Sequence, residues 1–363
     1  MELVNNIESL WLYNESNILA KTENQKLYSI NVENHVKRNI YSKTNDEQLM
    51  QSDINWYSGT FITRRSSDVE NRYIYRFHDA DKTFDIVIDK KVNKVNYLKT
   101  VKAICFKVES NIDNDSVSLF TDMNGKSIKV LNNYVGRGGD YPLEIISCSA
   151  EEKLAIIGYS SIVNPDKKPY ILCIDEKHNI QWEQTLTQGW SIYDIQSTYN
   201  NLAIISLHSI KGGTKVLLCS VDKGEIIHTF QYNDRMFQKV KISPSGMWTL
   251  IYGGNHVAVI NTNTKEEKWK YDLLKMGYNI DDAVINNEGK AFLIYSAIED
   301  NEPTLLVSVN DKITPETIWE SPNTTDYEKS IKSNSIILLK DNVILFRYGK
   351  YIMKLITDKE LGK

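Results

Sequence analysis

The sequence predicts an all-β fold built from repeated, four-stranded antiparallel units. A short apolar strand, an Asp/Asn-rich turn and a second strand recur eight times along the 363 residues. Two more β-rich runs joined by a tight polar turn precede most copies, and no stretch of ten or more residues favours an amphipathic helix over a strand. Four-stranded units repeated at intervals of about 40–50 residues are characteristic of a β-propeller, in which each unit is one blade.

The repeated motif usually carries Asp or Asn at its turn, where such side chains hydrogen-bond to nearby backbone groups. The copies begin at Leu27, Ile86, Ser118, Ile171, Leu217, Val257, Leu305 and Tyr351, and their turns are centred at Asn31, Asp89, Asp122, Asp175, Val221, Asn261, Asn310 and Ile356. Eight turns predict eight blades. The interval between Asp89 and Asp122 in the sequence is short for a whole blade, which leaves seven blades as the alternative.

The two strands that precede each motif are clearest in the segments beginning at Ile192, Phe237 and Ile280. Each segment has the pattern of a hairpin, with a short turn of Asn, Gly or Ser between two β-rich runs. The final segment supplies only three strands, SIILLKD, VILFRYG and YIMKLITD. We expect Met1 to Val4 to add the fourth strand, so that the two ends of the chain close one domain of residues 1–363.

The best-formed repeat carries two motifs that resemble known propeller families. KISPSGMW at Lys241 resembles the hairpin of WD40 repeats, and NTNTKEEKW at Asn261 resembles the turn of quinoprotein-like (PQQ-type) repeats. The chain therefore resembles a divergent WD40-like or PQQ-like propeller. Quinone-binding members of such families commonly use adjacent cysteines at the cofactor, and this sequence has no adjacent pair. We therefore expect no cofactor.

Composition narrows the class of protein. Hydrophobic residues make up 41% and charged residues 25% of the chain, and the net charge is −4, without the basic face that nucleic-acid binding requires. The N-terminus does not resemble a signal peptide, and no apolar run is long enough to span a membrane. Cys173 and Cys219 occupy the same place in successive repeats and are expected to be buried hydrophobic residues. A cytoplasmic protein without nucleic-acid or membrane partners is expected.

An aromatic residue begins most of the predicted innermost strands. Because inner strands surround the axis of a propeller, these side chains are expected near one mouth of its channel, where they would bind a peptide or ligand. The alternative is that each ring is a wedge between neighbouring blades. The candidate residues are Trp56 or Tyr57, Tyr141, Trp190, Phe237, Tyr278 and Tyr327.

Two aspartates follow these aromatics at matching places in their blades. Asp194 lies four residues after Trp190, and Asp282 lies four residues after Tyr278. With Asp140, Asp281 and Asp326 nearby in sequence, they would form an acidic mouth able to hold a cation or a basic partner. The alternative is that each carboxylate only caps a local turn.

The remaining sequence offers little chemistry. The loop VGRGGD at residues 135–140 is either an anion-binding nest or, as we favour, a flexible connector between blades. The six histidines have no metal-ligand spacing, and no nucleophile motif is present. We therefore predict no catalytic residues and no metal. The favoured function is a non-catalytic scaffold that binds a protein, peptide or small ligand at one mouth, as a monomer unless it joins a complex. A hydrolase or lactonase using axial carboxylates and a structural subunit of an assembly are the alternatives.

Overall fold

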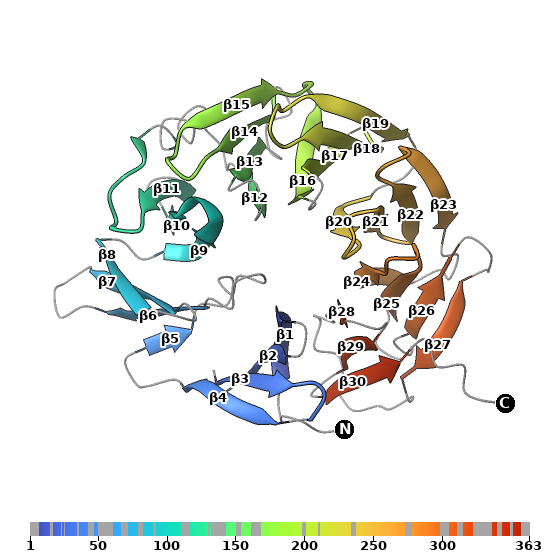
Figure 1. Ribbon diagram of the computed structural model, residues 1–363, viewed down its shortest axis with the longest axis horizontal. Coiled ribbons are helices and arrows are strands. Elements are labelled where there is room, and N and C mark those ends of the chain that lie inside the picture. Colours follow the sequence, from blue (N-terminus) through green and yellow to red (C-terminus); the bar gives the residue numbers. More distant parts are fainter. Residues whose placement is uncertain are drawn as a thin grey trace. The chain divides into compact units, whose positions relative to one another are not determined.

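The computed structural model consists almost entirely of β-strands (Figure 1). It describes residues 7–14, 17–22, 24, 26–34, 36–42, 47–49, 61–66, 72–78, 83–89, 92–109, 116–129, 131, 143–149, 154–160, 168–197, 201–209, 211–233, 237–272, 278–297, 305–310, 315–321, 336–339, 343–348 and 351–356. Within these ranges the strands form eight antiparallel sheets, six with four strands and two with three. Strands adjacent in a sheet are consecutive in the chain, so each sheet is an antiparallel meander.

The chain divides into two units, residues 44–240 and residues 1–43 with 241–363. The first contains β5 (Glu47–Leu49), β6 (Phe61–Ser66), β7 (Tyr73–His78) and β8 (Thr83–Ile88); β9 (Val92–Leu98), the 3-10 helix η1 (Lys99–Val101), β10 (Ala103–Glu109) and β11 (Ser116–Asp122); β12 (Leu143–Ser149), β13 (Leu154–Ser160), β14 (Tyr170–Ile174) and β15 (Ile180–Thr185); and β16 (Trp190–Ser197), β17 (Leu202–Ser209), β18 (Thr214–Ser220) and β19 (Ile226–Tyr232). That the whole chain is one domain stays a prediction.

The second unit contains the other four sheets, and the chain passes from one unit to the other within β20. Its strands are β1 (Ile7–Asn14), β2 (Asn17–Thr22), β3 (Lys26–Asn31) and β4 (Lys37–Ser42); β20 (Lys239–Ile242), β21 (Trp248–Gly253), β22 (His256–Asn261) and β23 (Glu266–Asp272); β24 (Tyr278–Ile285), β25 (Ala291–Ala297), β26 (Leu305–Val309) and β27 (Glu316–Glu320); and β28 (Ile336–Leu338), β29 (Val343–Tyr348) and β30 (Tyr351–Ile356). The last three are the strands predicted for the final segment. Met1 to Val4 lie outside the described residues.

The core is divided among the spaces between neighbouring sheets. In the second unit, Leu10 and Ile18 of the sheet β1–β4 pack with Ile337 and Leu345 of the sheet β28–β30, so segments from opposite ends of the sequence lie side by side (Figure 1). In the first unit, Ile171 and Cys173 of β14 pack with residues of β16, β17 and β18. Sheets buried on both faces explain why middle strands such as Leu305–Val309 are buried along their whole length and mostly apolar.

Turn capping by Asp and Asn is confirmed at several predicted centres. Asp175 Oδ1 accepts hydrogen bonds from the backbone N–H groups of Lys177 (2.8 Å) and Asn179 (2.9 Å). Asp122, Asn31 and Asn261 each accept two backbone N–H groups of their own turns in the same way. These side chains therefore stabilise the connection between the third strand and the segment that follows it.

The motif at Ile86 was assigned wrongly. Asp89 does not join two strands of one blade, because β8 belongs to the sheet β5–β8 whereas β9 begins the next sheet. The connection that matches the other motifs is the one between β7 and β8, which lies earlier in the chain. This explains the short interval between Asp89 and Asp122, since only Asp122 follows a third strand.

The sheet β9–β11 has no fourth strand within the described residues, which departs from the four-stranded prediction. After the Asp122 turn, Ser127 bridges to Thr121, and the Ile128 N–H donates to the Phe120 carbonyl (2.8 Å). Ile128 and Leu131 are buried in the adjoining core cluster. The chain therefore returns beside β11 and covers its edge without forming a regular strand.

Tryptophans that follow the predicted turns connect one sheet to the next. Trp182 Nε1–H donates to the Val221 carbonyl (2.7 Å), and Trp269 Nε1–H donates to the Gly289 carbonyl (3.2 Å). Gly224 lies against the Trp182 ring so closely that a Cβ there would meet Cδ2 at 2.5 Å, and its φ of +70° also favours glycine. Both tryptophans therefore have a structural role.

Cys173 and Cys219 are buried free thiols, as expected for small hydrophobic residues, and Cys105 is a buried free thiol as well. Burial raises the pKa of the Cys219 thiol to about 12. Among the described residues, no helix is both long and apolar enough to cross a membrane.

Candidate functional site

The structure describes only part of the predicted aromatic and acidic site. Trp190, Phe237, Asp194 and Asp282 are described with their side chains, whereas Tyr278 is described only as the first residue of β24. Trp56, Tyr57, Tyr141, Tyr327, Asp140, Asp326 and the loop at residues 135–140 lie outside the described residues.

Phe237 is buried in this structure, which agrees with the alternative of a wedge between blades. Its side chain is fully buried and packs edge-on against Tyr232, with ring centroids 4.8 Å apart. Its N–H donates to Thr214 Oγ1 (2.8 Å), and its carbonyl accepts from Ser206 Oγ (3.0 Å). The sheet β16–β19 therefore holds both the ring and the backbone of Phe237, which leaves no surface of this residue for a partner.

Trp190 lies at the start of β16 and is half-buried. One part of its indole packs against the core cluster that contains Ile192 and Leu207. The Nζ of Lys215, in β18 of the same sheet, lies 4.4 Å from the ring centroid, which is a cation–π contact. A cation of the protein itself thus already occupies the kind of site that the sequence suggested for a basic partner.

Asp194 connects its sheet to the next inner strand. The register between β16 and β17 shifts between Ile192 and Asp194, so Asp194 is the first paired residue after the irregularity. Asp194 Oδ2 accepts the backbone N–H of Val240 in β20 (2.8 Å), and Oδ1 accepts from Gln196 Nε2 (3.2 Å). Because the N–H is part of a buried residue, the carboxylate supplies a hydrogen bond that the inner strand needs.

Asp282 occupies the matching position in its own sheet and makes the matching bond. The β24–β25 register shifts between Ile280 and Asp282. Asp282 Oδ2 accepts the backbone N–H of Ile336 in β28 (3.2 Å), and Oδ1 accepts from the hydroxyl of the fully buried Tyr252 (2.9 Å). Lys241 Nζ lies 3.3 Å from Oδ1, so this carboxylate also has a cation of the protein itself beside it.

The two aspartates therefore hold inner strands in place, a role that sequence reasoning missed. The sequence shows the repeated four-residue spacing from an aromatic residue to an aspartate. It does not show that each aspartate binds a backbone N–H group, because that group belongs to the next repeat. Asp194 and Asp282 belong to different units, so the shared acidic mouth stays a prediction. In the part of the chain that is described, no three His, Cys, Asp or Glu side chains are grouped so as to hold a metal ion.

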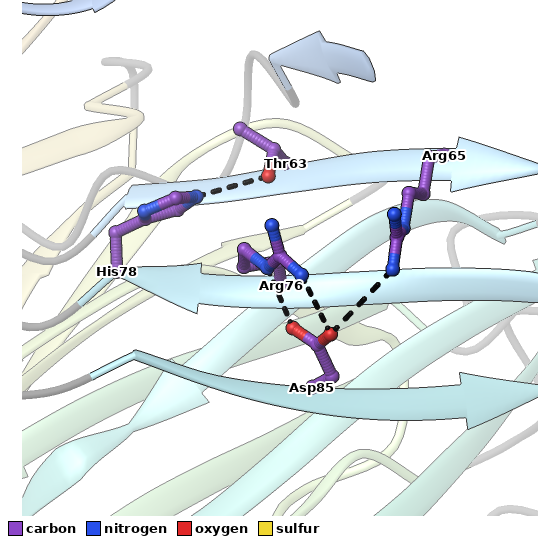
Figure 2. Close-up of polar contacts among 5 residues, drawn as sticks. All are labelled: Thr63, Arg65, Arg76, His78 and Asp85. Carbon is purple, nitrogen blue, oxygen red and sulfur yellow. Dashed lines mark hydrogen bonds and ion pairs between the residues drawn. The ribbon is translucent and has the colours of Figure 1, made fainter. Parts of the chain in front are cut away.

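A second group of polar residues lies on one face of the sheet β5–β8 (Figure 2). Arg76 Nε and Nη2 donate to the two oxygens of Asp85 (2.8 and 2.9 Å), and Arg65 Nη2 lies 4.0 Å from Asp85 Oδ2. His78 Nε2 lies 3.0 Å from Thr63 Oγ1, and its ring is stacked on that of Phe61. Hydrogen bonding by Arg76 is the main cause that lowers the pKa of Asp85.

Sequence reasoning overlooked this group because its members belong to three different strands. The alternation in β7 was a usable signal, since Tyr73, Tyr75 and Phe77 alternate with Ile74, Arg76 and His78. Tyr75 and Phe77 belong to the core cluster shared with β9 and β10, so the other three side chains must lie on the opposite face.

We expect the stability of the protein to fall as the pH drops from about 6.5 to about 4, in part because of His78. Burial, with a smaller contribution from Arg76, lowers the pKa of His78 from 6.5 to about 4. In this range the unfolded chain binds a proton that the folded chain does not, so the free energy of unfolding decreases with falling pH. Urea titrations at several pH values in this range give the free energy of unfolding at each pH. The decrease of this free energy with falling pH should be smaller for His78→Gln than for the wild type. An equal decrease in both proteins would contradict this role of His78.

Comparison with known proteins establishes the fold and no closer relationship. No protein-family model matches the chain, and no curated protein matches its sequence. Among solved structures, the Dos1 propeller is similar over 98% of this chain and 93% of its own, with a TM-score of 0.56 and 10% sequence identity. The β-propeller domain of Cps50 (Swd1) from Myceliophteria thermophila matches 82% of this chain and 95% of its own, with a TM-score of 0.48 and 10% identity. The likeness to the Dos1 propeller, together with the antiparallel sheets of consecutive strands, shows that this chain has a β-propeller fold.

Proposed function

We propose that this chain is a non-catalytic, eight-bladed propeller that binds a protein or peptide partner near Trp190. The eight antiparallel sheets of the described residues support one blade per sheet. The carboxylates that a propeller hydrolase would need are bound to backbone N–H groups of neighbouring inner strands instead. These bonds favour a structural role for the two aspartates and a rigid frame on which a partner can bind.

The observation that carries the proposal is the half-buried Trp190 with Lys215 over its ring. A large indole that is held in place by its own sheet and still partly exposed resembles the aromatic anchors of protein interfaces. Because Lys215 supplies a positive charge beside the ring, this site disfavours a basic partner. An apolar side chain with a nearby hydrogen-bond acceptor would fit both the indole and the ammonium group.

Trp190→Ala is expected to weaken partner capture from an extract of the source organism at least tenfold, the effect of about 1.4–2 kcal/mol at an interface hot spot. Capture on immobilised protein, quantified across a dilution series, measures this loss. Thermal unfolding of the variant measures how much of the change comes from lost stability, because part of the indole packs against the core.

Trp248→Ala is the matched control, since Trp248 is also half-buried and has Lys268 Nζ 4.2 Å from its ring centroid. This variant should capture the partner as well as the wild type does. If both variants lose capture in proportion to their loss of stability, Trp190 is a structural residue and the proposed binding site is wrong.

A further inference from the structure

The turn that follows β11 contains the one Asn-Gly pair in the sequence, Asn124–Gly125. Asp122 caps this turn. Its Oδ1 accepts the backbone N–H groups of Asn124 and Lys126 (both 2.9 Å), and the Gly125 N–H donates to the Asp122 carbonyl (3.0 Å). Hydrogen bonds therefore hold the backbone on both sides of the Asn124–Gly125 peptide bond. We call residues 122–126 the Asp122 turn.

The Asn124 side chain is open to reaction. It is exposed, and within the described residues its amide makes no hydrogen bond. Gly125 is also exposed, has a φ of +77° and carries no Cβ that could shield its backbone nitrogen. An electrophilic side-chain carbonyl and an unshielded backbone nitrogen are thus adjacent in the chain, and water reaches both residues.

We propose that Asn124 is a site of spontaneous deamidation and that the Asp122 turn controls its rate. The backbone nitrogen of Gly125 attacks Cγ of Asn124, a C–N bond forms, and the side-chain amide leaves as ammonia with the proton of the Gly125 nitrogen. Water then opens the cyclic imide at either carbonyl, which leaves aspartate or isoaspartate at position 124. The reaction needs water and no other reagent, in keeping with the chemical lability of asparagine.

The Asp122 turn slows the first step. The Gly125 N–H donates to the Asp122 carbonyl, so the nitrogen must give up this hydrogen bond and its proton before it attacks. The bonds from Asn124 and Lys126 to Asp122 Oδ1 also restrain the rotations that bring Cγ to the nitrogen. The folded chain should therefore deamidate more slowly at Asn124 than the unfolded chain does.

The products should loosen the segment that covers the edge of β11. Both products add a carboxylate two residues from Asp122, and isoaspartate also lengthens the main chain by one methylene group inside the turn. Just beyond the turn, the Ile128 N–H donates to the Phe120 carbonyl, and Ile128 and Leu131 pack in the adjoining core cluster. Deamidation of Asn124 is therefore expected to weaken these contacts.

The test is incubation of the full chain at neutral pH, followed by tryptic digestion and tandem mass spectrometry, which measures the conversion of each asparagine. Asn263 is the matched control in the same molecule, because it is exposed and its N–H binds Oδ1 of the capping Asn261 at 2.9 Å. The next residue, however, is Thr264, whose branched side chain shields its nitrogen. Asn124 should therefore convert about tenfold faster than Asn263 or more.

Two comparisons test the role of the turn. Conversion at Asn124 should be faster in urea-unfolded chain than in native chain. Asp122→Ala removes the acceptor for two N–H groups of the turn and should speed conversion in native protein about threefold or more. If this variant does not fold, the comparison of native with unfolded wild type decides the question.

Hydrogen exchange tests the consequence for β11. Anion-exchange chromatography separates the deamidated protein, which carries one more negative charge. Its amide at Ile128 should exchange faster than in unreacted protein, whereas the amide of Ile174 in β14 should not change. Asn124→Ser removes the reactive amide, so after the same incubation its exchange at Ile128 should stay constant.

Three results would overturn the proposal. Equal conversion at Asn124 and Asn263 would show that Asn124 is not a preferred site. Equal conversion in native and unfolded chain would show that the Asp122 turn does not control the rate. Unchanged exchange at Ile128 in the deamidated protein would show that the modification leaves the cover of β11 intact.

Discussion

Replacing Phe237 with alanine is expected to lower the free energy of unfolding by about 3–5 kcal/mol, as for other large aromatic residues removed from a packed core. The Phe237 ring is fully buried, and its loss would leave a cavity beside Tyr232. The bonds to Thr214 and Ser206 hold the backbone in place, which limits how far the site can collapse to fill that cavity. Urea unfolding at constant temperature measures the effect.

Phe230→Ala is the control for this prediction, because Phe230 lies on the outer strand β19 and is only half-buried. Its loss should cost clearly less than the loss of Phe237. If Phe237→Ala unfolded like the wild type but no longer captured a partner, the wedge interpretation would be wrong and Phe237 would belong to a binding surface.

Asp282→Ala should destabilise the protein by about 3 kcal/mol. The change removes the acceptor for the Ile336 N–H and for the buried Tyr252 hydroxyl, and each buried donor left without a partner costs about 1–3 kcal/mol. It also leaves Lys241 without the carboxylate beside it. Amide hydrogen exchange should locate the change, with faster exchange at Ile336 than at residues of β22.

Two further variants separate the acceptor role of Asp282 from its charge. Asp282→Asn keeps one carbonyl oxygen and should lose less stability than Asp282→Ala. Asp272→Ala removes an exposed carboxylate that pairs with His256 and should cost less than about 1 kcal/mol. If Asp282→Ala cost no more than Asp272→Ala, the aspartate would not hold β28 in place.

Local sequence signals predicted the strands and their turns well. Alternating and continuous apolar runs located the strands of most sheets, and the Asx side chains of Asp175 and Asn261 marked turns that they do cap. These features depend on residues a few positions apart, so one repeat contains all the information. The motif at Ile86 shows the limit of this reasoning, because a strand–turn–strand pattern is the same whether the two strands share a sheet or belong to consecutive sheets.

The candidate site was less predictable because its contacts join separate repeats. Nothing in the sequence near Trp190 indicates that Lys215 lies over its ring, since the two are in different strands. The partners of Asp194 and Asp282 are backbone N–H groups, which no residue type identifies. Nothing in the sequence indicates that Arg65 and Arg76 lie beside the same carboxylate. Arg76 binds both oxygens of Asp85, and Arg65 lies 4.0 Å from one of them.

The aspartate bond between inner strands has a consequence for how such repeats can diverge. Asp194 and Asp282 bind a main-chain N–H, which every residue type except proline provides. Substitutions at Val240 or Ile336 can therefore change the side chain without removing the hydrogen bond that the aspartate makes to the inner strand. The residue that supplies the N–H can therefore vary as long as the aspartate is kept. A sequence can thus lose its similarity to related sequences while this hydrogen bond to the inner strand remains.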